Sequence, residues 1–150
     1  MAIIGDIAHS RVARSNVHLL SKFGAEIVLC GPASLLPVEL TQLAPGVRLT
    51  TDIRDAIQDA DVVMMLRVQK ERLVGLNIDT QKYITHYQLT ADLLRLAKED
   101  AILMHPGPMV RGMEIQSELA ESPQAVIEEQ VHNGVFVRMA ILALCTGMAK

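Results

Sequence analysis

The chain has 150 residues, half of them hydrophobic and 21% charged, with a formal net charge of −3. This length can bury a core in one ordinary domain, and the composition is that of a globular protein. The acidic balance and an aromatic content of 3% argue against a nucleic-acid surface, which needs a basic field and often stacking rings. We expect neither a membrane span nor a signal peptide, because no apolar run approaches roughly 20 residues and the start lacks a basic segment.

The first elements alternate between strand and helix. Residues 2–7 (AIIGDI) form a short apolar run and predict a buried strand. Residues 11–24 place apolar side chains at helical spacing and end at Gly24, a helix stop signal. A second strand is predicted at 25–30, closed by a Gly-Pro pair.

The middle of the chain continues this alternation. A short helix is predicted at 35–44 and a third strand at 47–50. Residues 51–60 carry apolar side chains on one helical face after two possible capping residues. Residues 61–66 contain VVMML, which predicts a fourth strand, covered on both faces.

The last part of the chain is more mixed. Residues 71–89 are polar and aperiodic, which predicts a long loop. A helix at 90–100 and a fifth strand at 101–105 follow, and then loop chemistry at 106–115. The final predicted helix, 135–149, is apolar nearly all round, more than one buried face requires.

This order predicts an α/β fold, a Rossmann-like three-layer α/β/α sandwich around a five-stranded parallel sheet. The two cysteines, Cys30 and Cys145, form no CxxC motif, so we expect reduced core thiols in a cytoplasmic protein rather than a disulfide.

Polar segments follow three of the predicted strands, and ligands of open parallel sheets bind beyond the carboxyl ends of the strands. Guanidinium groups there suit carboxylates or phosphates, which they grip with two hydrogen bonds. The cationic and hydrogen-bonding residues of this edge are Arg11, Arg14, Arg67, Gln69, Lys70, Arg72, His105 and Arg111.

Plainer interpretations remain open for these residues. A single surface arginine or lysine usually forms a weak exposed ion pair. Residues 69–72 (QKER) can open a helix or a solvated loop, with Glu71 pairing locally, and His105 can be a satisfied histidine at a strand end. A dinucleotide site is rejected because GDIAHS has one glycine where that fingerprint needs three. The sequence shows no serine-hydrolase motif and no HExxH metal motif.

Four segments resemble the catalytic chain of the aspartate carbamoyltransferase family: GDIAHSRVARSN, LRVQKERL, HPGPMVRGMEI and VHNGVFVRMAILAL. Ornithine enzymes of similar fold carry HCLP where this chain has HPGP. The family's carbamoyl-phosphate motifs, S-T-R-T and H-P-x-Q, do not occur. The resemblance therefore implies that 1–150 is the aspartate-binding domain without the carbamoyl-phosphate-binding domain, a fragment cut by an investigator, a natural fragment or a permuted chain.

By this resemblance, Arg11 binds the α-carboxylate of L-aspartate, and Arg67 and Gln69 bind its side-chain carboxylate. The carbonyls of Pro106 and Gly107 orient the amine and the carbamoyl group. The supporting residues would be Lys70, Arg72, His105 and Arg111. The family's reaction transfers a carbamoyl group from carbamoyl phosphate to L-aspartate in pyrimidine synthesis, and it implies no metal or organic cofactor.

The resemblance also implies partners. The intact enzyme is a homotrimer, and members of the family associate with dihydroorotase or with regulatory chains. The chain alone should turn over negligibly and bind aspartate weakly, and its apolar last helix should cause dimerisation, helix swapping or C-terminal disorder. Two other functions stay open: a stand-alone dicarboxylate-binding module, and an assembly domain that only packs against other chains.

Overall fold

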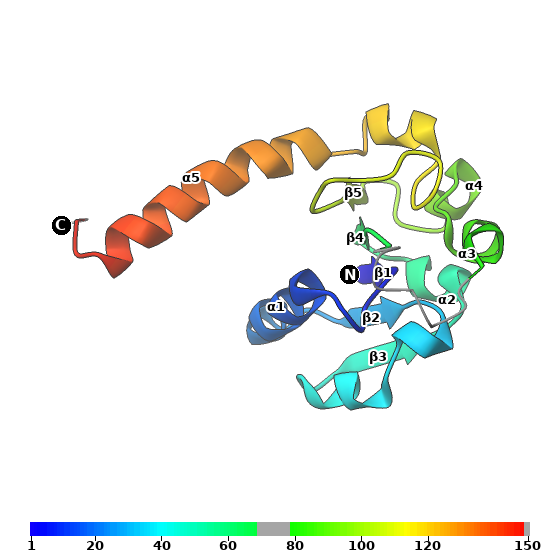
Figure 1. Cartoon of the computed structure of the whole chain (residues 1–150), viewed down its shortest axis with the longest axis horizontal. Coiled ribbons are helices and arrows are strands. Elements are labelled where there is room, and N and C mark those ends of the chain that lie inside the picture. The colour runs from blue at the N-terminus through cyan, green and yellow to red at the C-terminus, as the bar shows by residue number, and fades with distance from the viewer. Residues whose placement is uncertain (69–78, 149–150) are drawn as a thin grey trace.

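The computed structural model describes residues 1–68 and 79–148. Five parallel strands form one sheet in the order β3-β2-β1-β4-β5 (Figure 1). The strands are β1 (Ala2–Ile4), β2 (Ile27–Cys30), β3 (Val47–Thr50), β4 (Val62–Met65) and β5 (Ile102–Met104). The predicted α/β fold with a five-stranded parallel sheet is confirmed, because each of the five segments predicted to be a strand contains one of these strands.

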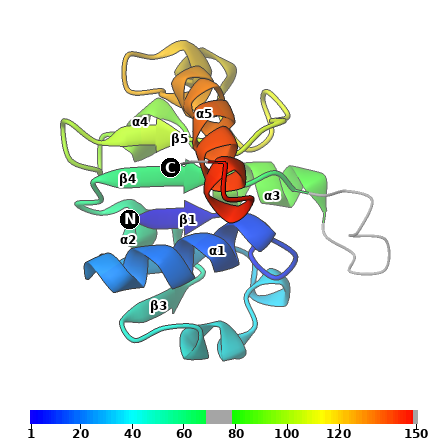
Figure 2. The ribbon, with the colours of Figure 1, turned by 90° about the vertical axis from the view of Figure 1, so that its left-hand side faces the viewer.

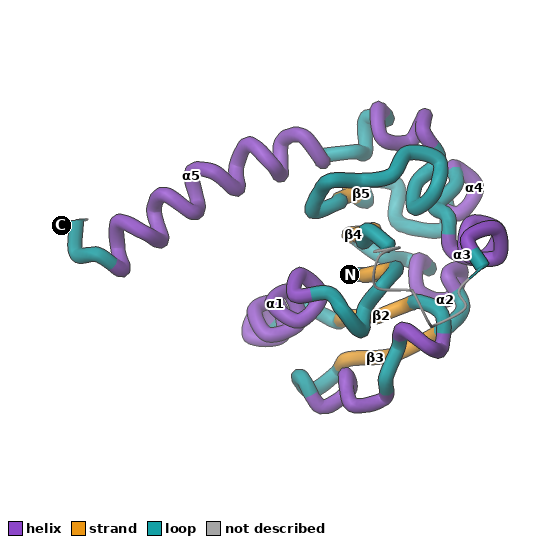
Figure 3. The backbone as a smooth tube through the Cα atoms, in the orientation of Figure 1, coloured by secondary structure: helices purple, strands orange, loops and turns teal. Residues whose placement is uncertain are grey.

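Helices cover both faces of the sheet (Figure 3). The α-helices are α1 (Arg11–Leu20), α2 (Ile53–Ile57), α3 (Thr80–Tyr87), α4 (Ala91–Leu94) and α5 (Ile127–Cys145). The 3₁₀ turns are η1 (Ser21–Phe23), η2 (Ala33–Leu35), η3 (Val38–Gln42) and η5 (Ser117–Glu121). Thr90 caps α4, because its hydroxyl accepts a hydrogen bond from the backbone N–H of Leu93.

Strand pleating divides the core into two layers, because successive side chains point to opposite faces. Ile3 packs with Ala13 and Val17 of α1, whereas Ala2 and Ile4 pack with α2 on the other face. The strands β1, β2 and β4 are short and largely buried, which explains why their sequences read as continuous apolar runs, whereas the edge strand β3 contains the exposed Arg48.

Residues 35–44 do not form the predicted helix. They contain the end of η2 and all of η3, with Pro37 as the residue before η3. A proline disfavours helical backbone in the residue before it, and Leu36 accordingly has φ −132° and ψ 63°. The chain therefore divides into two short turns at this point.

The long loop predicted at 71–89 is wrong for its second part, while residues 71–78 lie outside the described residues. Asp79 begins α3 by accepting hydrogen bonds from the backbone N–H groups of Gln81 and Lys82. Tyr83 is the one buried residue of this helix, so the sequence has no apolar stripe to reveal it.

The last helix begins at Ile127, eight residues earlier than predicted, and Glu128 and Glu129 stand in its first turn, where the helix dipole favours acids. Its later part projects away from the sheet (Figures 1 and 2), and Cys145 on it is exposed, so only Cys30 is a core thiol. Burial raises the pKa of the Cys30 thiol to about 12. None of the described helices combines the length and hydropathy needed to cross a membrane.

Candidate functional site

The sheet reverses its order between β1 and β4, and ligands of open parallel sheets bind outside the carboxyl ends of the strands at such a reversal. Ile4 pairs with Cys30 of β2 on one side and with Met65 of β4 on the other. The chain runs from β1 toward β2 and β3, and then returns across the sheet to β4. Three loops meet this edge, at 5–10, 66–68 and 105–115, and Figure 2 shows α3 beyond the strand ends.

The first loop places Arg11 at the start of α1. The carboxylate of Asp6 is buried and accepts hydrogen bonds from the backbone N–H of His9 at 3.2 Å and from His9 Nδ1 at 2.8 Å. Ser10 then caps the helix by accepting from the N–H of Ala13. The loop is therefore fixed before Arg11, whose own side chain is exposed.

Arg14 contacts the backbone of the loop that precedes its own helix. Its guanidinium donates to the carbonyl oxygen of Ala8 at 2.8 Å and to that of Ser10 at 3.3 Å. These bonds hold the chain just before Arg11. The guanidinium group of Arg14, which the sequence suggested for ligand binding, therefore holds the loop in shape with these hydrogen bonds.

Arg67 lies two residues after the end of β4, between two buried residues, Leu66 and Val68. Val68 packs with Tyr83 of α3 and with Met113 of the third loop. Arg67 is itself partly buried, so its position is set from both sides. Three other predicted residues, Gln69, Lys70 and Arg72, lie outside the described residues.

The third loop begins with His105, which is fully buried. Its Nδ1 accepts a hydrogen bond from the N–H of Gly107 at 3.0 Å, and its own backbone N–H donates to Gln130 of α5. Burial lowers the pKa of His105 to about 4, so the ring is neutral near pH 7 with its proton on Nε2. This turn sets the backbone of Pro106 and Gly107.

Gly107 adopts φ 67°, a left-handed conformation that glycine takes without cost. Arg111, further along this loop, forms an exposed ion pair with Glu121 of η5 at 2.8 Å. The ion pair joins the loop to the turn that follows it.

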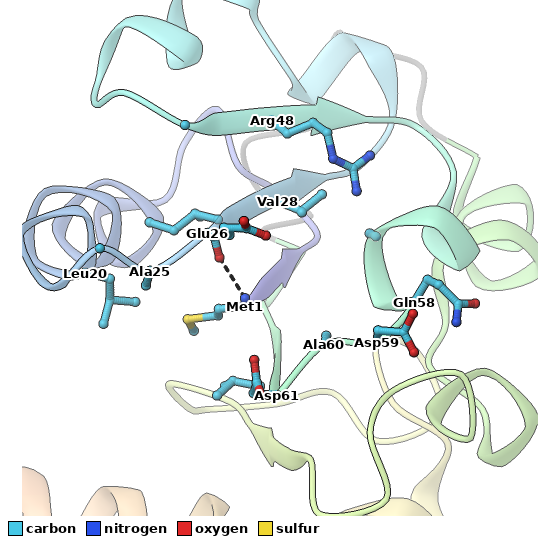
Figure 4. A pocket seen from close by; sticks show the side chains of 15 residues that line it. Met1, Leu20, Ala25, Glu26, Val28, Arg48, Gln58, Asp59, Ala60 and Asp61 are labelled. Carbon is cyan, nitrogen blue, oxygen red and sulfur yellow. Dashed lines mark hydrogen bonds between the residues drawn. The ribbon is translucent and has the colours of Figure 1, made fainter.

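A hollow of 860 Å³ lies at the amino ends of the strands (Figure 4). Its lining residues include Met1, Glu26 and Asp61, which directly precede the strands, and the Met1 ammonium donates to the Glu26 carbonyl at 2.8 Å. This hollow is therefore separate from the three loops. Within residues 1–68 and 79–148, no three His, Cys, Asp or Glu side chains are grouped to hold a metal ion.

Comparison with known proteins identifies the family. Residues 1–145 match the family model described as aspartate/ornithine carbamoyltransferase, Asp/Orn binding domain. The chain belongs to this family. A relative from Solibacter usitatus, named aspartate carbamoyltransferase catalytic subunit, is 66% identical over 147 residues, which are 98% of this chain and 49% of that protein. A subunit of the same name from Koribacter versatilis is 59% identical over 142 residues, 95% of this chain and 47% of that protein.

Solved carbamoyltransferases have the same fold. Ornithine carbamoyltransferase from Pyrococcus furiosus matches with a TM-score of 0.85 and 28% identity, over 99% of this chain and 50% of that one. Aspartate transcarbamoylase from Trypanosoma cruzi, in complex with carbamoyl aspartate and phosphate, matches with a TM-score of 0.79 and 31% identity, over 94% and 47%. This carbamoyltransferase domain thus spans about half the length of the relatives that it matches.

The structure adds polar residues at the carbamoyltransferase domain's strand ends that the sequence did not single out for a role. They include Asp6 and His9 in the first loop, Glu114 in the third, and Gln130 at the start of α5. The sequence signal for Glu114 was an acid inside an otherwise apolar MEI triplet, which predicts either an exposed turn or a buried acceptor.

Proposed function

We propose that this chain is the L-aspartate-binding half of an aspartate carbamoyltransferase, which transfers a carbamoyl group from carbamoyl phosphate to the α-amine of L-aspartate. One arrangement supports the proposal: Arg11 and Arg67 lie on the segments that follow the carboxyl ends of two neighbouring strands, β1 and β4, at the reversal of the sheet. Arg11 would bind the α-carboxylate, and Arg67 with Gln69 the side-chain carboxylate.

The charge of the site favours aspartate over ornithine. Ornithine carries an ammonium group where aspartate carries its second carboxylate, and a cation facing Arg67 would be repelled. Asparagine would leave the same guanidinium without a charged partner, which is a strong basis for selectivity. The two relatives described above, at 66% and 59% identity, are both named for aspartate.

The chemistry needs no nucleophile from the protein, because the amine of the substrate attacks the carbamoyl carbon and phosphate leaves. The domain would contribute orientation and charge. The turn at Pro106 and Gly107 supplies carbonyl oxygens for the amine, and His105 holds that turn through the N–H of Gly107. Lys70, Arg72 and Arg111 would support the loops around the substrate.

The complete reaction requires the half that the longer relatives possess. We therefore expect negligible turnover by this chain alone, and activity in a cytoplasmic homotrimer formed by the longer protein, alone or with dihydroorotase or regulatory chains. Mixing the chain with a separately produced carbamoyl-phosphate-binding half should restore formation of carbamoyl aspartate. A well-folded mixture that forms none would contradict the proposal.

Binding can be tested on the chain by itself. An NMR titration should show L-aspartate binding with a dissociation constant in the millimolar range or weaker, equivalent to about 4 kcal/mol, and no comparable binding of L-ornithine. Arg67→Ala should abolish the response, whereas Arg95→Ala, which removes an exposed partner of Asp92 on α4, should leave it unchanged. Micromolar binding, or equal loss in both variants, would contradict the assignment.

A further inference from the structure

The carboxylate of Glu114 connects two of the three loops. The side chain is fully buried, and Oε1 accepts a hydrogen bond from the N–H of Val68 at 3.1 Å. Oε2 accepts from the N–H of Val110 at 2.9 Å. Val68 is the residue after Arg67, and Val110 is three residues beyond Gly107. The Glu114 side chain therefore contacts both the segment that carries Arg67 and the loop whose carbonyl oxygens would orient the amine.

The backbone of Glu114 is itself held firmly. Its carbonyl oxygen accepts from the N–H of Leu89 at 2.9 Å, and the N–H of Gln116 donates back to Leu89 at 2.9 Å. Met113, beside it, packs with Val68 and Tyr83. The backbone that carries the carboxylate is therefore fixed, and the length of the Glu114 side chain determines the distance between the two loops.

A carboxylate is a costly choice for a buried position. Among the described residues, backbone amides rather than a cation hold this one. An apolar side chain of similar size would usually stabilise the fold at least as well. What the carboxylate adds is two directed acceptors, one for each loop, and this is a benefit of geometry rather than of burial.

We propose that Glu114 is a positioning residue of the substrate site, which fixes the distance between Arg67 and the turn at Pro106 and Gly107. This inference rests on the proposed function, in which these groups bind opposite parts of L-aspartate. Binding at Arg67 would then be transmitted to the third loop through the two hydrogen bonds of one carboxylate.

The test compares the wild-type chain with Glu114→Gln and with Glu118→Gln, the same change at an exposed residue of η5. The glutamine amide keeps an oxygen for one loop but presents N–H₂ to the other, where another N–H already points. Amide hydrogen exchange at Val68 or Val110 should accelerate at least tenfold in Glu114→Gln and remain unchanged in Glu118→Gln. The dissociation constant for L-aspartate should rise at least fivefold in Glu114→Gln alone.

Each outcome has a distinct meaning. Unchanged exchange at both amides, or unchanged aspartate affinity in a folded Glu114→Gln chain, would overturn the inference. Wild-type protein that shows no response to L-aspartate would refute the proposed function, while the exchange rates still decide whether Glu114 joins the loops. If Glu114→Gln does not fold, wild-type exchange decides: L-aspartate must protect Val68 and Val110 together, and protection of Val68 alone overturns the inference.

Discussion

The backbone of Gly5 lies directly against the carbonyl oxygen of Leu66, so close that a Cβ atom added to the glycine would stand 2.8 Å from it. Gly5 also has φ 133°, a conformation that side chains of L-residues rarely adopt. The contact joins the ends of β1 and β4, and the N–H of Leu66 donates to Ile4 at 2.8 Å. Because Gly5 has no side chain, the first and second loops of the site can pack directly against each other.

Gly5→Ala should therefore destabilise the fold by more than about 2 kcal/mol, through backbone strain and the displaced carbonyl together. Urea unfolding measures the change. Gly46→Ala is the matched control, because Gly46 also has a positive φ, 79°, but open space where the Cβ would stand. Equal losses in the two variants would show that the contact with Leu66 contributes nothing.

His105 should make stability depend on pH. Its pKa is about 4 in the folded chain, below the ordinary value of 6.5, because burial disfavours the charged ring. The unfolded chain therefore binds the additional proton first as the pH falls. The contribution of His105 to the free energy of unfolding should be constant above pH 6.5. It should decrease as the pH falls from 6.5 to 4, by up to about 3 kcal/mol.

Urea unfolding between pH 7 and 4.5 checks this prediction. His105→Asn is the informative variant, because its side-chain oxygen can accept from the N–H of Gly107 without titrating in this range. In this variant, the free energy of unfolding should lose most of its dependence on pH. His18→Asn, at an exposed histidine of α1, should keep it. A slope that is identical in wild type and His105→Asn would rule out this role.

Sequence patterns predicted the sheet because its strands depend on local features. The apolar runs specify strands, and parallel strands bring Arg11 and Arg67 to one edge whatever the details of the loops. The contact of Glu114 with Val68 could not be predicted, because it joins residues 46 apart and depends on the conformation of two loops. The helix α3 was missed for a different reason, since Tyr83 is its one buried residue.

Arg14 should be required for the shape of the first loop. Its removal in Arg14→Ala would leave the carbonyls of Ala8 and Ser10 without their charged donor, which typically costs about 1–2 kcal/mol for a partly buried bond. Aspartate affinity should decrease severalfold, because Arg11 follows this loop directly. Thermal unfolding and an NMR titration measure both effects. Arg54→Ala, at an exposed arginine of α2, should change neither, and a normal affinity in Arg14→Ala would contradict the loop's role.

The exposed apolar surface of α5 should make the chain associate. Eight large apolar residues of this helix are more than half exposed, and they lie on all its sides, so one neighbouring surface cannot cover them by itself. They are Val131, Val135, Phe136, Val137, Met139, Ile141, Leu142 and Leu144. Sedimentation velocity should show a dimer or larger species in a concentration-dependent equilibrium.

Met139 and Leu142 allow this association to be tested, because both line a hollow of 640 Å³ between α5 and the start of α1. Replacing both by glutamine keeps helix propensity and removes apolar area, so the association constant should fall at least tenfold. Phe23→Gln is the matched control, since Phe23 is 78% exposed but belongs to η1. A wild-type chain that sediments as a monomer at high concentration, with α5 helical by NMR, would show that this surface does not drive association.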